Sequence, residues 1–448
     1  MARGGKPRYL EVFASLLFVL GLLPLLAISA VPDYVKDHAP IIWLHSNDSF
    51  MPSDIPSHAQ HTKAFKRFKP LADSPVLDFN NLSSLNQYGK DIYLTAVENI
   101  TTMPEWLFGE TPDVTGALHN STACAVVLIE RKDQIVDAFY FYFYSFDEGA
   151  DITQVLPPLN KILPDSKPGD HFGNHVGDWE HNMVRFKDGV PVGIWYSQHA
   201  WGEACLWNDE ACLSKQGDRP VVYSARGSHA NYPSAGSHVH DAALIDVADK
   251  GRLWDPIQPA WFYTYDPSTD NLTALEPETA PTDWFSFLGG WGDQQYPDDD
   301  PRQQTVPYFG LKKYNSGPNG PRFKHLLRKD LMPDEKPKPT LMGTLVRIYM
   351  SWYGCCLRGI NPWVVVISIL LFLAVTTFLA VFTVRRLTPV GKRWLTRARK
   401  GKHASGIGSA KGLGTKVTDW FTRRKRRQEH SSEYSMGLLD PREGEDEV

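Results

Sequence analysis

The sequence predicts an all-β fold, a β-sandwich with long loop insertions, for residues 31–335 of this 448-residue chain, followed by a single transmembrane helix. Two observations predict this organisation. Short runs rich in β-branched and aromatic residues alternate with turn residues through the first region, where amphipathic helical periodicity is weak. An uncharged apolar run then fills residues 363–384, and a helix of that length, at about 1.5 Å per residue, crosses a bilayer.

Seven segments of the first region have the composition of strands. In the longest, residues 138–144 are aromatic throughout and alternate Phe with Tyr, so the two kinds of ring face opposite sides of a strand. We expect a central strand with its phenyl face in the core, and a sugar-stacking surface on the tyrosine side is the alternative. The seven segments are residues 39–44, 125–130, 135–146, 182–186, 192–197, 220–224 and 260–265.

The two ends of the chain are predicted to be targeting and anchoring segments. Residues 1–30 have the basic start, apolar run and small-residue end of a signal peptide, with an uncleaved anchor as the alternative. Residues 336–361 are predicted to form a membrane-proximal stem with an amphipathic helix, and residues 362–384 the transmembrane helix. Residues 385–448 form a basic, disordered tail, with 16 Lys and Arg against 8 Asp and Glu. Because positive segments stay on the cytoplasmic side, we expect a single-pass type I membrane protein whose bulk is lumenal.

Cysteines and glycosylation sequences are consistent with an oxidising lumen. Cys205 and Cys212 lie close enough in sequence to close a small loop, and we expect a disulfide there, with a metal–thiolate site as the alternative. Five Asn-X-Ser/Thr sequences are candidate glycosylation sites: Asn47, Asn81, Asn99, Asn120 and Asn271.

Charge and motifs exclude several classes of function. The formal net charge of −4 combines an acidic ectodomain with a basic tail suited to anionic lipid, so we expect membrane contact and no nucleic-acid partner. The sequence has no His-Glu-x-x-His motif, no Gly-x-Ser-x-Gly elbow, no phosphate loop and no dinucleotide fingerprint. Whether the protein is an enzyme stays open, and these absences favour a non-enzyme.

Residues 169–181, Gly-Asp-His-Phe-Gly-Asn-His-Val-Gly-Asp-Trp-Glu-His, contain the densest group of potential ligands in the chain. Asp178 and Glu180 are two residues apart, so on an extended backbone both carboxylates leave the same face, while His181 points the other way. Two carboxylates with a histidine such as His175, or with water, suit a hard divalent cation, Mg²⁺, Ca²⁺ or Mn²⁺.

The alternative to a metal site is a hydrogen-bonded or salt-bridged cluster. The sequence between Asp170 and Arg185 contains no basic residue, which leaves the carboxylates without a local partner and favours the metal. Arg226 could nevertheless neutralise them from a neighbouring strand.

Four motifs of the ectodomain are similar to a known family. They are Ala-Pro-Ile-Ile-Trp-Leu-His at 39–45, Gly-Asp-Trp-Glu-His at 177–181, Tyr-Ser-Gln-His at 196–199 and Arg-Pro-Val-Val-Tyr-Ser-Ala-Arg-Gly-Ser-His-Ala-Asn-Tyr-Pro at 219–233. Together and in this order they resemble the vacuolar protein sorting family conventionally numbered sixty-two. The resemblance covers nearly the whole ectodomain and implies a protein of the secretory pathway or vacuolar membrane.

A more distant likeness concerns the possible ligands. The residues around Asp178 resemble the Gly-His-Arg-His-Asp-Trp-Glu motif of the necrosis- and ethylene-inducing peptide-like cytolysins, β-sandwich proteins that hold a divalent cation. By that likeness His175, Asp178 and Glu180 would be ligands, directly or through water, and Asp147 would be the upstream aspartate. The Arg-His pair of that motif is replaced here by Val176 and Gly177, so the likeness does not extend to membrane lysis.

Three functional hypotheses follow. In the first, the lumenal domain binds a divalent cation through the four ligands and recognises a glycolipid or glycan during vacuolar protein targeting. In the second it is a metal-dependent hydrolase of the secretory pathway, with His181, His199 or His229 as general acid or base. In the third it is a receptor for cargo or sorting proteins, and the cluster only braces a loop. Residues that could support the ligands or contact a bound molecule are His181, His199, Arg226 and His229.

Overall fold

The computed structural model of the chain describes residues 30–72, 76–151, 170–239, 245–306, 310–334 and 362–387. They belong to two compact units, Met1–Gly359 and Ile360–Val448. The predicted signal peptide up to residue 29, the stem at 336–361 and the tail beyond residue 387 lie outside the described residues.

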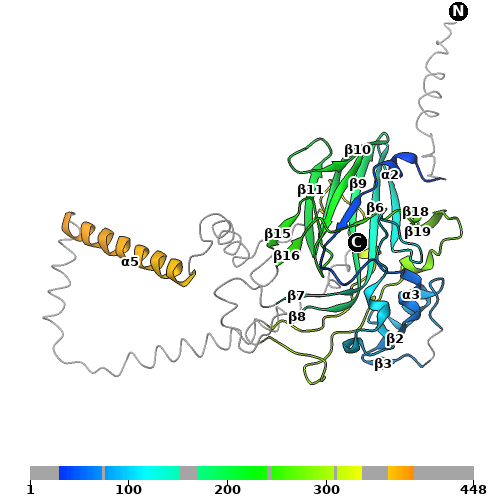
Figure 1. Ribbon diagram of the computed structural model, residues 1–448, viewed down its shortest axis with the longest axis horizontal. Helices are drawn as coiled ribbons and strands as arrows, with labels where there is room; N and C mark the ends of the chain where they lie inside the picture. The colour runs from blue at the N-terminus through cyan, green and yellow to red at the C-terminus, as the bar shows by residue number, and fades with distance from the viewer. Residues whose placement is uncertain are drawn as a thin grey trace, which may run out of the picture. The chain divides into compact units, whose positions relative to one another are not determined.

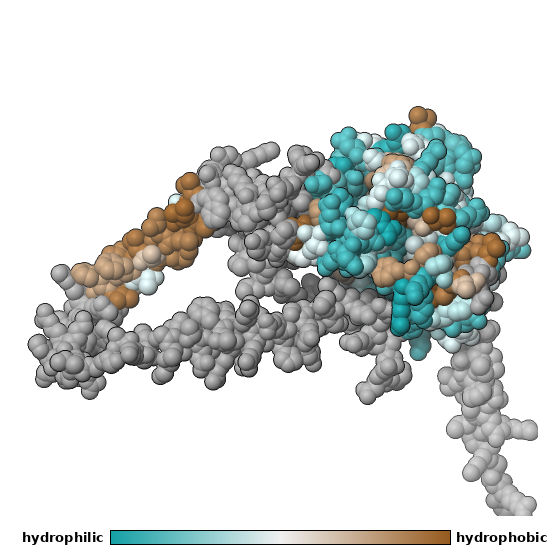
Figure 2. All heavy atoms as spheres, turned by 90° about the horizontal axis from the view of Figure 1, so that it is seen from below, coloured by the Kyte–Doolittle hydropathy of each residue, from teal (hydrophilic) through white to brown (hydrophobic). Residues whose placement is uncertain are grey.

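The described part of the second unit is one helix, α5 (Pro362–Leu387), which runs three residues past the end expected for the membrane span. Its segment Val366–Thr383 is long and apolar enough to cross a membrane. Figure 2 shows hydrophobic side chains around this helix, whereas the visible face of the first unit is mostly hydrophilic. By length and composition, α5 is therefore a candidate membrane-spanning helix.

The first unit is built on a seven-stranded sheet in which β6 and β9 are central (Figure 1). The strand order is β11-β10-β9-β6-β5-β18-β19, and every neighbouring pair is antiparallel except β5 with β18. The strands are β5 (Cys124–Arg131), β6 (Ile135–Asp147), β9 (His175–Lys187), β10 (Val190–Gln198), β11 (Trp201–Leu206), β18 (Trp261–Asp266) and β19 (Asn271–Glu276).

A second sheet packs against the first and has the order β12-β13-β1-β17, with β14 paired to β13. Its strands are β1 (Ile41–Leu44), β12 (Lys215–Gln216), β13 (Arg219–Ser224), β14 (Asn231–Tyr232) and β17 (Arg252–Trp254). Ile42, Val222 and Trp254 of this sheet share one buried core with Tyr140 and Val184 of the larger sheet. The first unit is therefore a two-layer β-sandwich, which confirms the predicted fold class.

Smaller elements surround the sandwich. One three-stranded sheet consists of β2 (Thr62–Lys66), β3 (Lys69–Pro70) and β4 (Tyr93–Ala96). Two two-stranded sheets pair β7 (Ala150–Asp151) with β8 (His171–Phe172), and β15 (Gly236–Val239) with β16 (Ile245–Ala248). The short helices are α2 (Asp33–Asp37), α3 (Ile55–Gln60), η1 (Leu82–Tyr88), η2 (Ile100–Thr102), η3 (Glu105–Phe108), η6 (Asp283–Ser286) and η7 (Pro321–Phe323).

All seven predicted strands are present, and the largest difference concerns β9. The composition predicts a strand from residue 182, whereas β9 begins at His175 and pairs with β6 in one register from Asp147 opposite His175 to Ile135 opposite Lys187. The polar residues at the start of this segment hide its strand character, because they face a polar end of the sandwich. The candidate ligands of residues 175–180 therefore lie on a strand in the middle of the sheet.

The Phe and Tyr side chains of β6 point to opposite sides of the sheet, as predicted, but the tyrosine side is not exposed to solvent. Phe139, Phe141 and Phe143 pack in the core on one side of the sheet. The tyrosines on the other side are at most 1% exposed, because the second sheet covers them. Their hydroxyls are used internally: Tyr140 donates to the Val35 carbonyl at 2.6 Å and Tyr142 to Asn182 Oδ1 at 3.0 Å. The alternative of a sugar-stacking tyrosine face is therefore wrong.

Gly177 allows the polar start of β9 to pass beneath a neighbouring segment. Its φ of +70° favours glycine, and a Cβ at this position would lie 1.9 Å from the carbonyl oxygen of Trp291. That oxygen in turn accepts a hydrogen bond of 3.1 Å from buried His58 Nε2. The space that a side chain at position 177 would need is therefore filled by the backbone of Trp291, which cannot move aside as a side chain could.

We predict that Gly177→Ala lowers the free energy of unfolding of the full chain by roughly 2–4 kcal/mol, through the clash together with the unfavourable φ. Gly217→Ala is the matched control, because Gly217 has a φ of +64° and no atom within 4 Å of the added Cβ. It should cost only about 1 kcal/mol. Denaturant unfolding of both variants measures the difference, and equal losses would contradict the close-approach argument.

Candidate metal centre and its cavity

Asp147, His175 and Asp178 converge at one end of the two central strands. Asp147 is the last residue of β6 and pairs with His175, the first of β9, while Asp178 follows on the far side of Gly177. One possible ligand atom from each of the three side chains lies within 4.8 Å of the other two. The antiparallel register alone brings an aspartate and a histidine that are 28 positions apart to the same point.

The ring of His175 is held in the orientation that a metal ligand needs. Its Nδ1 lies 2.7 Å from the carbonyl oxygen of Gly177, and because a carbonyl can only accept, Nδ1 carries the proton. Nε2 then has a free lone pair in the neutral ring, and it faces Asp147 Oδ2 at 3.5 Å. A backbone bond to the second ring nitrogen is the usual support of a metal-bound histidine.

Burial shifts the pKa of two of these three residues, Asp147 and His175. It raises the pKa of Asp147 well above its usual range, and the negative charge of Asp178 raises it further. Burial also lowers the pKa of His175. Two buried carboxylates beside a neutral imidazole form a centre that a positive ion would stabilise, and this donor set suits a hard divalent cation.

His229 supplies one positive charge to this centre. Its Nδ1 donates to Asp178 Oδ2 at 3.0 Å and its Nε2 lies 3.3 Å from the Phe50 carbonyl oxygen, so both nitrogens face acceptors and the ring is an imidazolium. The ring stacks on Tyr144 with centroids 3.7 Å apart. Burial lowers its pKa, but the Asp178 bond and the charge of Asp48 outweigh this and raise the pKa to about 9.

Asp178 is ionised as a result. Burial alone would raise its pKa, but the hydrogen bond and the positive charge of His229 hold that pKa below its usual value. The partner of the carboxylate is therefore His229 and not Arg226, whose guanidinium binds Glu148 at 3.1 Å instead. This supports part of the hydrogen-bonded-cluster alternative, since one of the carboxylates has a cationic partner.

Glu180 lies beside the three converging residues and is not one of them. It is buried, and its Oε2 accepts a hydrogen bond of 2.7 Å from Ser197 Oγ. Burial raises its pKa to about 8. The structure thus brings together three of the four residues expected to be ligands, and the fourth is positioned by Ser197 on the neighbouring strand.

His181 faces away from the cavity, as the strand alternation predicts. It packs against Phe139 on the opposite side of the sheet, where its Nε2 accepts a hydrogen bond of 3.0 Å from buried Arg328 Nη2. Burial and the charge of Arg328 hold its pKa well below its usual value. A role of His181 as general acid or base at the carboxylates is therefore excluded by its position.

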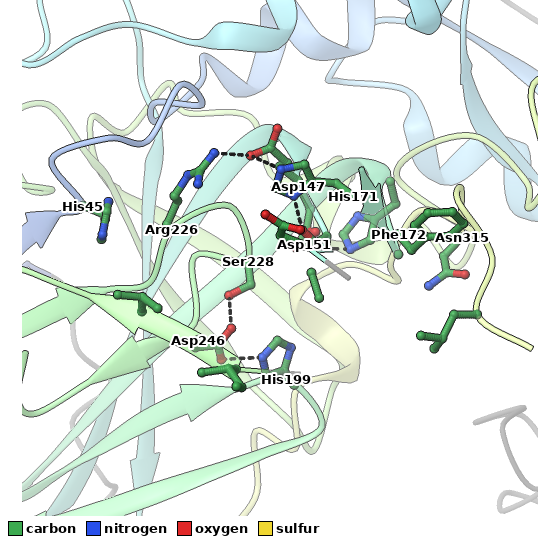
Figure 3. A pocket seen from close by; sticks show the side chains of 18 residues that line it. His45, Asp147, Asp151, His171, Phe172, His199, Arg226, Ser228, Asp246 and Asn315 are labelled. Atoms are coloured by element: carbon green, nitrogen blue, oxygen red, sulfur yellow. Dashed lines mark hydrogen bonds and ion pairs between the residues drawn. The ribbon is translucent and has the colours of Figure 1, made fainter. Parts of the chain in front are cut away.

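A cavity of about 410 Å³ is lined by Asp147 and His175 of the three converging residues. Figure 3 shows Asp147 among the side chains around it. One wall contains His199, whose Nε2 lies 2.6 Å from Asp246 Oδ2. Asp246 is buried and also accepts hydrogen bonds from Ser228 Oγ at 2.8 Å and from the Tyr232 hydroxyl at 2.6 Å. The polar lining includes Asp147, Glu148, His175, His199, Arg226 and Asp246.

Some residues that line the cavity could not be recognised from a motif in the sequence. Asp246 and Glu148 stand among ordinary strand and loop residues, and only the pairing of distant segments brings them to the cavity. Ser228 belongs to the Ala-Arg-Gly-Ser-His-Ala motif, which was the available signal. His238 stacks on Tyr232 and binds the Ser234 carbonyl at 3.0 Å.

The predicted disulfide and the candidate glycosylation sites are not among the residues that line the cavity. Cys205 and Cys212 form a disulfide that ties the end of β11 to the next loop. Asn81 is half-buried, and its amide binds the Val76 carbonyl. The four other glycosylation candidates are exposed on loops or strand ends: Asn47, Asn99, Asn120 and Asn271.

Fold and site together define a β-sandwich protein with a candidate cation centre at one end of its two central strands and, by length and composition, one helix able to cross a membrane. The family description "Vacuolar protein sorting-associated protein 62" matches residues 156–251. The chain is 35% identical over 335 residues to the putative vacuolar protein sorting-associated protein TDA6 of Saccharomyces cerevisiae, covering 67% of this chain and 68% of that protein.

It is also 33% identical over 337 residues to vacuolar protein sorting-associated protein 62 of Saccharomyces cerevisiae, with 67% of each chain covered. The chain belongs to the vacuolar protein sorting-associated protein 62 family. Membership supports a role related to vacuolar protein sorting, and with α5 it fits a membrane protein.

Solved structures offer a weaker likeness. Necrosis and Ethylene inducing Protein 2, from the causal agent of cocoa's Witches Broom disease, is 12% identical, with a TM-score of 0.22 over 50% of this chain and 71% of that chain. The non-toxic HaNLP3 protein is 10% identical, with a TM-score of 0.24 over 53% and 76%. Likenesses at this level carry no conclusion about the ligand or the activity.

We predict that the contribution of His229 to stability depends on pH in a defined direction. Its folded pKa of about 9 exceeds the ordinary histidine value of about 6.5, so the stabilisation is full below pH 6.5 and is lost as the pH rises through 9. With a chelator present, the free energy of unfolding of wild type should exceed that of His229→Gln by on the order of 1–3 kcal/mol at pH 6. This difference should vanish by about pH 9.5. His119→Gln, at an exposed histidine, is the control. A gap that widens with pH would contradict the assigned charge.

Proposed function

We propose that the first unit is a lumenal domain that binds a divalent cation and uses it to recognise a glycan or lipid head group during vacuolar protein targeting. Asp147, His175 and Asp178 would be the protein ligands, and Glu180 would contribute through water. The observation that carries the proposal is the convergence of the three donors, with the free lone pair of His175 turned towards the carboxylates. Mg²⁺, Ca²⁺ and Mn²⁺ all suit this donor set.

The neighbouring cavity supports a binding function. Its volume of about 410 Å³ lies in the range of sites for small molecules, roughly 300–1,000 Å³. Phe172 and Leu311 give it an apolar part, while Asp151 and Asn315 add polar groups close to the candidate centre. A sugar or a head group combines the same two properties, since apolar ring faces alternate with hydroxyls. When bound, the cation would supply a positive centre for ligand oxygens.

A metal-dependent hydrolase is the second candidate, and one observation favours it. His199 lines the same cavity as Asp147 and His175, and Asp246 orients its ring in the manner of a general acid or base. Ser228 is not a nucleophile of this group, because its hydroxyl binds Asp246 and not His199. Capture of a ligand without turnover would favour the binder over the hydrolase. The third candidate, a receptor for cargo or sorting proteins, needs no metal.

We predict that the purified full chain binds about one divalent cation and that Asp178→Asn lowers its occupancy at least tenfold, since a carboxylate ligand is lost. Elemental analysis after dialysis against limiting metal measures this. Asp246→Asn is the matched control, because Asp246 is a buried carboxylate of the same cavity outside the three converging residues. Equal metal content in wild type and Asp178→Asn would sink the proposal and favour the metal-free receptor.

The lumenal placement of the first unit also belongs to the proposal, and the glycosylation sites test it. We predict that peptide N-glycosidase increases the electrophoretic mobility of the full chain made in a secretory-pathway host. A chain with all five candidate asparagines changed to Gln should show no shift. A wild-type chain that does not respond to the enzyme would contradict a lumenal first unit.

A further inference from the structure

Two of the ion pairs that line the cavity, His199 with Asp246 and Arg226 with Glu148, have the cation as the more exposed partner. The side chain of His199 is 28% exposed, whereas that of Asp246 is 3% exposed. The side chain of Arg226 is 36% exposed and that of its partner Glu148 is 23% exposed. At these two pairs the wall presents the positive partner to a ligand, whereas at His171 and Glu148 the carboxylate is the more exposed partner.

The negative charge of Asp246 is shared among several donors. Besides His199, it accepts hydrogen bonds from Ser228 and Tyr232, and its carboxylate is buried behind them. The imidazole of His199 therefore faces a carboxylate whose charge is already spread over two hydroxyls. His199 also has a φ of +53°, an uncommon conformation for a residue with a side chain. Such strain is often maintained where a side chain has a function.

Arg226 has donors beyond those it uses. Its Nη2 binds Glu148 at 3.1 Å, whereas its Nε is buried and has no partner among the described residues. Arg226 is fixed by its backbone, since its amide donates to the Val247 carbonyl at 2.9 Å and its carbonyl accepts from the Ser228 amide at 2.9 Å. A guanidinium fork held through one nitrogen by Glu148 is suited to a planar or tetrahedral oxyanion.

We propose that the ligand of this cavity carries a phosphate group, which is received by Arg226 and His199 while other oxygens of the ligand approach the centre at Asp147, His175 and Asp178. The inference rests on the proposed function and narrows it to phosphorylated ligands. Figure 3 shows Arg226, His199 and Asp147 at separate places around the same cavity. A phosphorylated sugar and a phospholipid head group share the required chemistry.

The first test measures binding of glucose 6-phosphate and of glucose to the full chain in detergent with Mg²⁺ or Ca²⁺ present. Wild type should bind the phosphate at least tenfold more tightly, as expected for two charge-assisted contacts. Arg226→Gln and His199→Gln should each reduce this preference about tenfold, and Arg226→Lys should keep part of it. Arg322→Gln, at a surface arginine paired with Asp270, is the matched control and should change nothing.

The second test separates the two sources of phosphate. Vesicles of phosphatidylcholine with and without phosphatidylinositol are mixed with the full chain in a sedimentation assay, for wild type and the same variants. Binding that requires phosphatidylinositol and is lost in Arg226→Gln, without binding of the sugar phosphate, assigns the phosphate to a lipid head group. Binding of the sugar phosphate alone assigns it to a soluble ligand, and either result supports the proposal.

Three outcomes overturn the inference. They are binding of neither phosphate probe, measurable binding of glucose and of its phosphate with equal affinity, or an unchanged preference for the bound phosphate probe in Arg226→Gln whose thermal unfolding matches wild type. Metal content keeps this inference distinct from the proposed function, because Arg226→Gln removes none of the three converging residues and should retain the cation. Loss of phosphate binding with the cation retained concerns the phosphate site alone.

Discussion

The antiparallel pairing of β6 with β9 is the constraint on which the rest of the structure depends. The two strands lie side by side in the middle of the larger sheet and keep one register over their whole length. Both faces of the pair are buried, so a slip of one residue would move the phenyl rings of β6 into the space of its tyrosines and reverse the polar residues of β9. The same register places Asp147 opposite His175.

The polar end of this strand pair requires compensation, because it is buried. Asp178 is ionised only beside the imidazolium of His229, and Glu180 has one hydroxyl partner in Ser197. Asp147 has no comparable donor among the described residues, and burial together with the negative charge of Asp178 raises its pKa. The centre therefore has one more carboxylate than its own cationic partner neutralises. That imbalance is the physical basis for proposing a cation here and phosphate recognition beside it.

Much of the fold and part of the site could be predicted from local patterns. The composition correctly predicted seven strand segments, because runs of β-branched and aromatic residues between turns favour strands. The spacing of Asp178 and Glu180 correctly separated them from His181, since side chains alternate along a strand. The same reasoning failed for the tyrosines of β6, because alternation defines two faces but does not say whether a second sheet covers one of them.

The sequence by itself determined seven strand segments, the apolar helix, the family motifs and the residues of β9 that share a face, because each depends on neighbours within a few positions along the chain. Only the tertiary structure decided which distant groups complete the centre. The pairing of Asp147 with His175, the choice of His229 in place of Arg226 as the partner of Asp178, and the support of His199 by Asp246 all join separate segments. Such contacts depend on register and sheet packing, which local spacing does not encode.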